Sequence, residues 1–136
     1  IMTNIRSYKV SINTTGGAGV ATGEADSVPF AGRILSVEYI PGPTSPPATT
    51  DVTAFITRDG DKDTNVETLS TFTNVSTANV KRYPRKEVDD GAGVSLAAAN
   101  KTNVFAEFTT AHGIHVEVAQ SDALSPAAIV EVIVEE

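Results

Sequence analysis

The chain has no cysteine and no tryptophan among its 136 residues. Without cysteine it has neither a disulfide scaffold nor a thiolate metal site. No apolar run approaches the roughly 18–20 residues of a membrane-spanning helix. The first residues also lack the basic and apolar regions of a signal peptide. We therefore expect no membrane partner and no secretion leader.

Positive charge is scarce as well. Asp and Glu number 17 against 10 Lys and Arg, so the formal net charge is −7. Proteins that bind nucleic acid neutralise phosphates with clustered positive charge, so nucleic acid is not an expected partner. A strong negative balance instead favours solubility and resists self-association.

The chain is rich in short segments in which apolar and polar residues alternate. The segment 129–134 is the most regular, because Val130, Val132 and Val134 are all apolar while Glu131 lies between two isoleucines on the alternate set. Successive side chains of a strand point to opposite faces, so this pattern predicts one dry and one mixed face. Other predicted strands are 7–14, 20–26, 33–40, 51–58, 66–75, 104–108, 114–119 and 127–135.

No segment of 12 or more residues has sustained helical spacing of apolar positions. Short strands separated by Gly, Pro and Asp turns are typical of β-sandwiches. We therefore predict an all-β chain, an antiparallel β-sandwich or jelly roll of seven to nine strands, with residues 1–136 forming a single domain. Four of the seven prolines fall in 41–47, which predicts a stiff loop.

The two histidines, His112 and His115, are the first candidates for chemistry. A metal site using both is one interpretation, but an odd spacing on a strand sends side chains to opposite faces, and Gly113 indicates a turn. We interpret both as exposed or hairpin histidines. No nucleophile motif accompanies them, so no catalytic residues and no cofactor are predicted, and the chain is not expected to be an enzyme.

Alternating carboxylates at Asp59, Asp61 and Asp63 form the best candidate for a metal site in the sequence. Such oxygens suit a hard cation like Ca²⁺. However, the glycine is misplaced for an EF-hand and Lys62 opposes cation binding. We expect a solvated acidic hairpin tip, with a weak calcium site as the alternative.

Four of the ten basic residues lie within positions 81–86. Arginine can bind carboxylates through two parallel hydrogen bonds, so this segment predicts a docking patch for an acidic partner surface. The alternative is local neutralisation by the acidic residues at 87, 89 and 90, since exposed ion pairs contribute only about 0–1 kcal/mol. The predicted partner-binding residues are Lys81, Arg82, Tyr83, Arg85 and Lys86.

The order of these motifs resembles that of small virion proteins of tailed bacteriophages. The resemblance rests on Gly-Arg-Ile-Leu-Ser-Val-Glu-Tyr at 32–39, Thr-Asp-Val-Thr at 50–53, the segment 69–75, Arg-Tyr-Pro-Arg at 82–85, and the final pair of strands. It implies a β-sandwich that serves as a head decoration or cement protein, or as a minor head or tail component. The implied partners are the major capsid protein, other virion proteins and further copies of the chain in a dimer or trimer. The implied location is the capsid surface, after synthesis in the host cytoplasm.

Three other functions remain open from the sequence. A carbohydrate-binding or receptor-binding module is the principal alternative, because many sandwiches bind glycans. Such a module usually presents stacked aromatics, whereas Tyr8, Tyr39 and Tyr83 are scattered. An adhesin-like subunit would need a secretion signal. A hydrolase is the least supported, since it would need a paired nucleophile and base.

Overall fold

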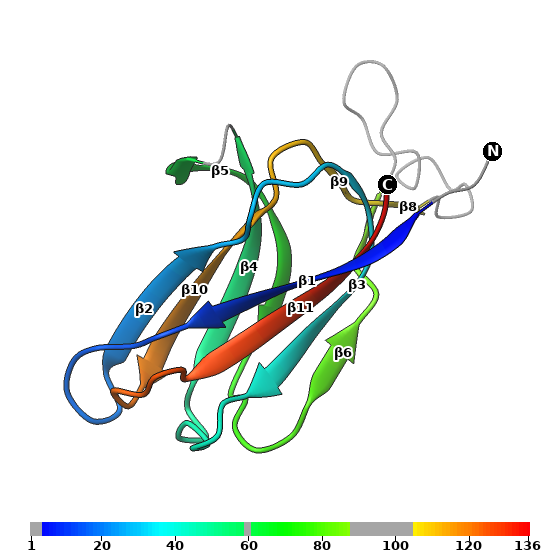
Figure 1. Ribbon diagram of the computed structural model, residues 1–136. Helices are drawn as coiled ribbons and strands as arrows, with labels where there is room; N and C mark the ends of the chain where they lie inside the picture. The colour runs from blue at the N-terminus through cyan, green and yellow to red at the C-terminus, as the bar shows by residue number, and fades with distance from the viewer. Residues whose placement is uncertain (1–3, 59–60, 88–104) are drawn as a thin grey trace.

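The computed structural model describes residues 4–58, 61–87 and 105–136. In this part of the chain all regular secondary structure is β, and every strand pairing is antiparallel. Two sheets face each other (Figure 1). The predicted antiparallel sandwich is therefore confirmed.

The first sheet has the strand order β1-β11-β3-β6, and β9 also pairs with β3. Its strands are β1 (Ile5–Ile12), β3 (Gly32–Pro41), β6 (Val80–Arg82), β9 (Thr109–Thr110) and β11 (Ala128–Glu135). The second sheet has the order β2-β10-β4-β5. Its strands are β2 (Ala21–Asp26), β4 (Asp51–Arg58), β5 (Asp61–Phe72) and β10 (Ile114–Ser121). At one side of the sandwich the edge strands are β5 and β6.

Apolar side chains from both sheets fill the space between them. Val130, Val132 and Val134 of β11 are fully buried, as their alternation predicted. The rings of Tyr39 in β3 and Phe72 in β5 lie 6.3 Å apart across the core. β-Branched and aromatic side chains suit this pleated, half-buried setting. The core thus holds the two sheets together through many small apolar contacts.

A β-bulge in β3 interrupts the alternation of its buried side chains. Strict alternation with the buried Val37 and Tyr39 would bury Leu35, yet Ile34 is the fully buried residue and Leu35 is only partly buried. The register passes from Ser36, opposite Ile133, to Ile34, opposite Val134, so Leu35 is an extra residue. An extra residue reverses the inward and outward positions on one side of it.

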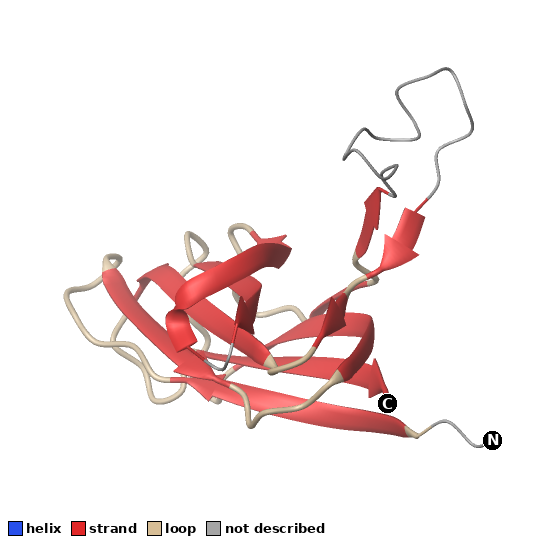
Figure 2. Ribbon diagram, turned by 90° about the horizontal axis from the view of Figure 1, so that it is seen from above, coloured by secondary structure: helices blue, strands red, loops and turns tan. Residues whose placement is uncertain are grey.

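Two more strands form a ribbon outside the sandwich. β7 (Arg85–Glu87) pairs with β8 (Phe105–Glu107), and Figure 2 shows this ribbon extending away from the two packed sheets. The two sheets of the sandwich hold nine strands, within the predicted seven to nine, and the ribbon adds two more among the described residues. Phe105 in β8 is 52% exposed. The ribbon therefore presents apolar as well as charged surface beyond the core.

Candidate functional site

A groove runs along the edge of the sandwich between β5 and the segment that contains β6. The two strands belong to different sheets, β6 pairing with β3 and β5 with β4, so each has a free edge on this side. Free strand edges present unpaired backbone donors and acceptors. The groove is lined by Thr68, Leu69, Ser70, Thr71, Lys81, Arg82, Tyr83, Pro84, Arg85 and Phe108.

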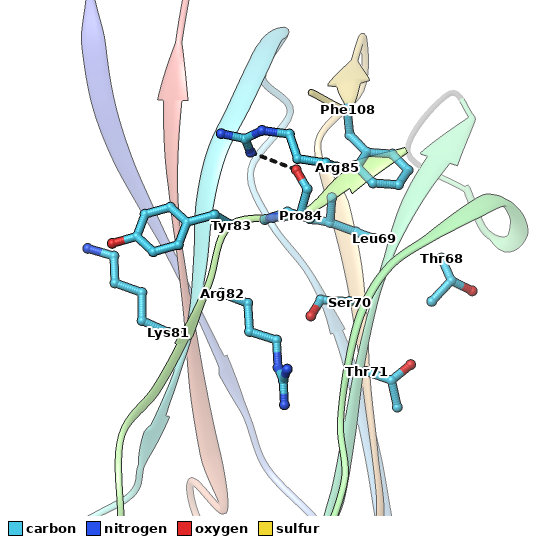
Figure 3. A pocket seen from close by; sticks show the side chains of 10 residues that line it. All are labelled: Thr68, Leu69, Ser70, Thr71, Lys81, Arg82, Tyr83, Pro84, Arg85 and Phe108. Carbon is cyan, nitrogen blue, oxygen red and sulfur yellow. Dashed lines mark hydrogen bonds between the residues drawn. The ribbon is translucent and has the colours of Figure 1, made fainter. Parts of the chain in front are cut away.

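The lining combines an apolar floor with polar walls (Figure 3). Leu69 and Phe108 are buried, while the hydroxyl-bearing residues 68, 70 and 71 come from β5. The opposite wall carries positive charge. The arrangement can contact an apolar group, accept or donate hydrogen bonds through hydroxyls, and bind anionic groups. These are contacts for recognition by surface complementarity.

Strand alternation divides the predicted patch between two directions. Lys81 and Tyr83 lie together on one side, with the Lys81 ammonium 5.8 Å from the centroid of the Tyr83 ring. Arg82 points the other way, into the groove (Figure 3), with its guanidinium carbon 5.6 Å from the centroid of the Phe72 ring. Tyr83 is 64% exposed. The patch therefore offers a cation inside the groove and an aromatic ring at its rim.

The cations of the ribbon are neutralised, but by residues the sequence did not indicate. Arg85 lies 3.6 Å from Glu107 of β8, and its guanidinium donates a 2.8 Å hydrogen bond to the carbonyl of Pro84. Lys86 lies 3.5 Å from Glu67 of β5 and does not line the groove. The alternative of local pairing with the acidic side chains at 87, 89 and 90 falls outside the described residues. Strand pairing, rather than sequence proximity, supplies these partners.

Lys81 and Arg82 differ from the ribbon cations. Lys81 is opposite Glu38 in the register between β6 and β3. Among the described residues, however, no carboxylate oxygen lies within 4.0 Å of the Lys81 ammonium or the Arg82 guanidinium. These two cations can therefore bind an acidic group without first breaking an ion pair.

A buried tyrosine supports the strand that forms one wall of the groove. Tyr39 of β3 lies opposite Val80 of β6, and its hydroxyl donates a 2.8 Å hydrogen bond to the carbonyl of Ser76. Burial raises the pKa of Tyr39 to about 12. The neutral phenol thus ties the segment that leads into β6 to the core.

The interpretation of the histidines is right for His112 and wrong for His115. His112 is exposed in the turn before β10, while His115 in β10 is completely buried. Gly113 separates them with φ +89°, and a Cβ there would lie 2.4 Å from the hydroxyl oxygen of Ser27. This left-handed turn explains why the two rings have different surroundings. The pairing of His115 with carboxylates of β2 was invisible in the sequence.

Most of the acidic segment 59–63 lies outside the described part of the chain. Asp59 is outside the described residues, and so are the side chains of Asp61 and Asp63, although these two positions belong to β5. The predicted hairpin is confirmed, since β4 and β5 are antiparallel neighbours. The weak calcium site stays a prediction.

Sequence reasoning found one wall of the groove and missed the other. Residues 68–71 and Phe108 carry no motif, and they reach residues 81–85 only through tertiary structure. Alternation within β5 was the available signal, and it marks outward-facing residues without naming their neighbours.

Comparisons with known proteins assign no family. No family model and no curated protein matches the chain. One similar solved structure is a mutant of a family 29 carbohydrate-binding module studied for ligand recognition. It has 6% sequence identity and a TM-score of 0.36, and the alignment covers 97% of this chain and 81% of that one. Similarity at this level does not transfer function. Within the described residues no helix is long and apolar enough to cross a bilayer.

Proposed function

We propose that this protein is a non-enzymatic binding protein that docks onto an acidic partner protein through the edge groove. The observation that carries the proposal is the pair Lys81 and Arg82, whose charges have no carboxylate within 4.0 Å among the described residues. Both residues precede the exposed Tyr83 in the sequence, in a chain whose net charge is −7. Arg and Tyr are enriched among residues that dominate interface energies.

The ribbon of β7 and β8 supports a contact larger than the groove. It extends from the edge of the sandwich next to the groove and exposes Phe105 (Figure 2). A stable protein interface buries about 800 Å² on each partner. Together the groove and ribbon provide an elongated surface for such a contact.

Within this function, we propose that the partner is the major capsid protein of a tailed bacteriophage and that the chain is a decoration or cement protein on the capsid surface. The layout resemblance to small virion proteins supports this choice. Bridging neighbouring capsid subunits would add buried area that resists expansion of the shell. Mass spectrometry of purified virions should find many copies per particle, and a major capsid gene should lie beside this gene.

The docking surface is tested by charge reversal at the groove. Arg82→Glu should weaken binding to purified shells by about tenfold or more, because a groove cation becomes a like charge facing the acidic partner. Occupancy on shells, measured by sedimentation at several protein concentrations, gives the affinity.

Lys9→Glu is the matched control. Lys9 lies in β1, at the opposite edge of the same sheet, and its substitution changes the net charge equally. Thermal unfolding of each variant checks that both are folded. Equal losses of binding would mean that net charge, and not the groove, sets occupancy. Absence of binding between the wild-type chain and purified shells would overturn the capsid proposal.

A carbohydrate ligand is the second candidate, and the lining of the groove favours it. Tyr83 provides an exposed ring at the rim of the groove, and Thr68 and Ser70 contribute hydroxyls to its lining. A glycan array with the wild-type chain and Tyr83→Ala separates the candidates. Glycan binding that Tyr83→Ala abolishes, without binding to shells, would replace the capsid partner.

A further inference from the structure

The outer face of the second sheet carries three carboxylates around one buried imidazole. Glu24 and Asp26 come from β2, and Glu117 comes from β10 beside His115. In the register, Glu24 is directly opposite Glu117, and Asp26 is directly opposite His115. Like charges directly opposite each other on neighbouring strands are destabilising. This arrangement calls for a cation between them.

The ring of His115 is held in one orientation. Its Nδ1 lies 2.7 Å from Oδ1 of Asp26, and the ring stacks on Phe55 with centroids 6.3 Å apart. A carboxylate can only accept, so it takes the hydrogen bond from Nδ1–H. In a neutral imidazole the Nε2 atom then carries the lone pair, which is the form that binds a metal. A carboxylate that fixes the tautomer in this way is the usual second partner of a metal-bound histidine.

Among the described residues the Nε2 atom has no hydrogen-bond partner, although the side chain is 0% exposed. It lies 3.6 Å from Oε2 of Glu24 and 3.4 Å from Oε1 of Glu117. A buried nitrogen without a partner is costly. A lone pair facing two carboxylates is also repelled by them, so the space between these three atoms favours a cation.

We propose that Glu24, His115 and Glu117 bind a divalent transition-metal ion of the zinc type, with Asp26 as the positioning residue of the imidazole. The three donor atoms lie within 4.8 Å of one another. Two donors of a tetrahedral zinc ion, each about 2.0–2.2 Å from the metal, are about 3.4 Å apart. The two distances from Nε2 match this spacing.

The surroundings suit an ion that keeps an open position. Both glutamates are half-exposed, so their side chains can adjust to the metal. They also line a surface hollow together with Thr22, Gly23, Val118 and Ala119. Water can occupy a fourth position from this side. The imidazole nitrogen favours Zn²⁺ over Ca²⁺ and Mg²⁺, which prefer oxygen donors.

The bound ion would cross-link β2 to β10, so its effect includes stability. β2 is an edge strand of its sheet. A ligand that binds only the folded chain raises the midpoint of thermal unfolding. This inference is independent of the edge groove and is tested on the isolated chain.

The test is a calorimetric titration of the chelator-treated full chain with Zn²⁺, with Ca²⁺ and Mg²⁺ as comparison ions. We expect one zinc ion per chain and a higher unfolding midpoint with zinc. In NMR spectra, zinc should shift the ring signals of His115 and leave those of His112 unchanged. Glu24→Gln with Glu117→Gln should weaken zinc binding by more than tenfold, and Asp26→Asn by about tenfold.

His112→Gln and Glu131→Gln are the matched controls, a histidine and a glutamate away from the site, and neither should change zinc affinity. The double glutamate variant keeps the buried ring, so the test does not depend on whether a His115 variant folds. The proposal is overturned if the wild-type chain binds no zinc. It is equally overturned if binding survives the double variant or disappears in His112→Gln.

Discussion

The outer faces of the two sheets handle charge in different ways. Across the first sheet, Lys9, Glu131, Glu38 and Lys81 are opposite one another in successive strands. This row holds two positive and two negative charges, and Lys9 lies 3.8 Å from Glu131. The positive and negative charges within this row are therefore equal in number.

At the equivalent place in the second sheet, carboxylates lie opposite each other and around one histidine. Glu24 and Glu117 face each other, and Asp26 faces His115. Among the described residues, the one basic side chain within 4.0 Å of Asp26 or Glu117 is His115. The difference shows that strand register in one fold can place opposite charges across one outer face and like charges across the other.

The largest expected difference between the two faces lies at their central strands. His115→Ala in β10 should destabilise the fold by about 2–3 kcal/mol, because it removes a buried ring and the hydrogen bond to Asp26. Glu131→Ala in β11 should cost less than about 1 kcal/mol, because its ion pair is solvent-exposed. Urea unfolding of both variants measures the difference. Equal costs would remove the contrast between the faces.

A smaller effect concerns buried polar groups in the two sheets. The hydroxyl of Tyr39 has its partner at Ser76, whereas Nε2 of His115 has none. Tyr39→Phe should therefore cost about 1 kcal/mol, the usual net value of one hydrogen bond. Urea unfolding at pH 7 measures this cost. A cost near zero would mean that the hydroxyl contributes no net stability to the segment before β6.

The same tyrosine predicts a pH dependence. Its pKa is raised from 10.0 to about 12 in the folded chain. Between these values the unfolded chain has lost the proton that the folded chain keeps, so stability falls as pH rises from 10 to 12. The contribution is fully present below pH 10. Unfolding curves from pH 9 to 12 should show a shallower decline for Tyr39→Phe, and identical slopes would contradict this origin.

The smallest expected effect concerns Lys9, which belongs to the row of alternating charges across the first sheet. Lys9→Gln should destabilise the fold by a few tenths of a kcal/mol, because one exposed ion pair is lost. The loss should shrink further in 1 M salt, which screens exposed charges. Unfolding midpoints at low and high salt measure it. A loss that grew with salt would show that Lys9 acts through packing and not through charge.

The sequence predicted that each long strand exists, but not all of their bounds. Alternation located β4 and β11 to within one residue, because the period of two is a local property of the chain. The longest strand, β5, was predicted at 66–75 but spans Asp61–Phe72. The three short strands β6, β7 and β9 were missed, since segments of two or three residues carry too little pattern. Their pairing depends on β3 and β8, which are distant in sequence. The bulge at Leu35 was hidden for the same reason.

The candidate sites were also only partly predictable from the sequence. The charge cluster at 81–86 and the presence of Tyr83 could be read directly from the chain. That Arg82 turns into a groove opposite Ser70 while Lys86 pairs with Glu67 depends on which sheet each strand joins. Two of the three carboxylates around His115, those of Glu24 and Asp26, lie about ninety positions away in sequence.

By itself, the sequence determined that this protein is built of alternating strands with an acidic surface and one basic segment. These properties follow from side-chain chemistry and from the geometry of an extended backbone. The tertiary structure alone decided which charges are paired, which line a groove and which surround a buried imidazole. The physical reason is that strand register determines which residues lie opposite each other. Register is fixed in turn by the burial of the apolar faces of both sheets against each other.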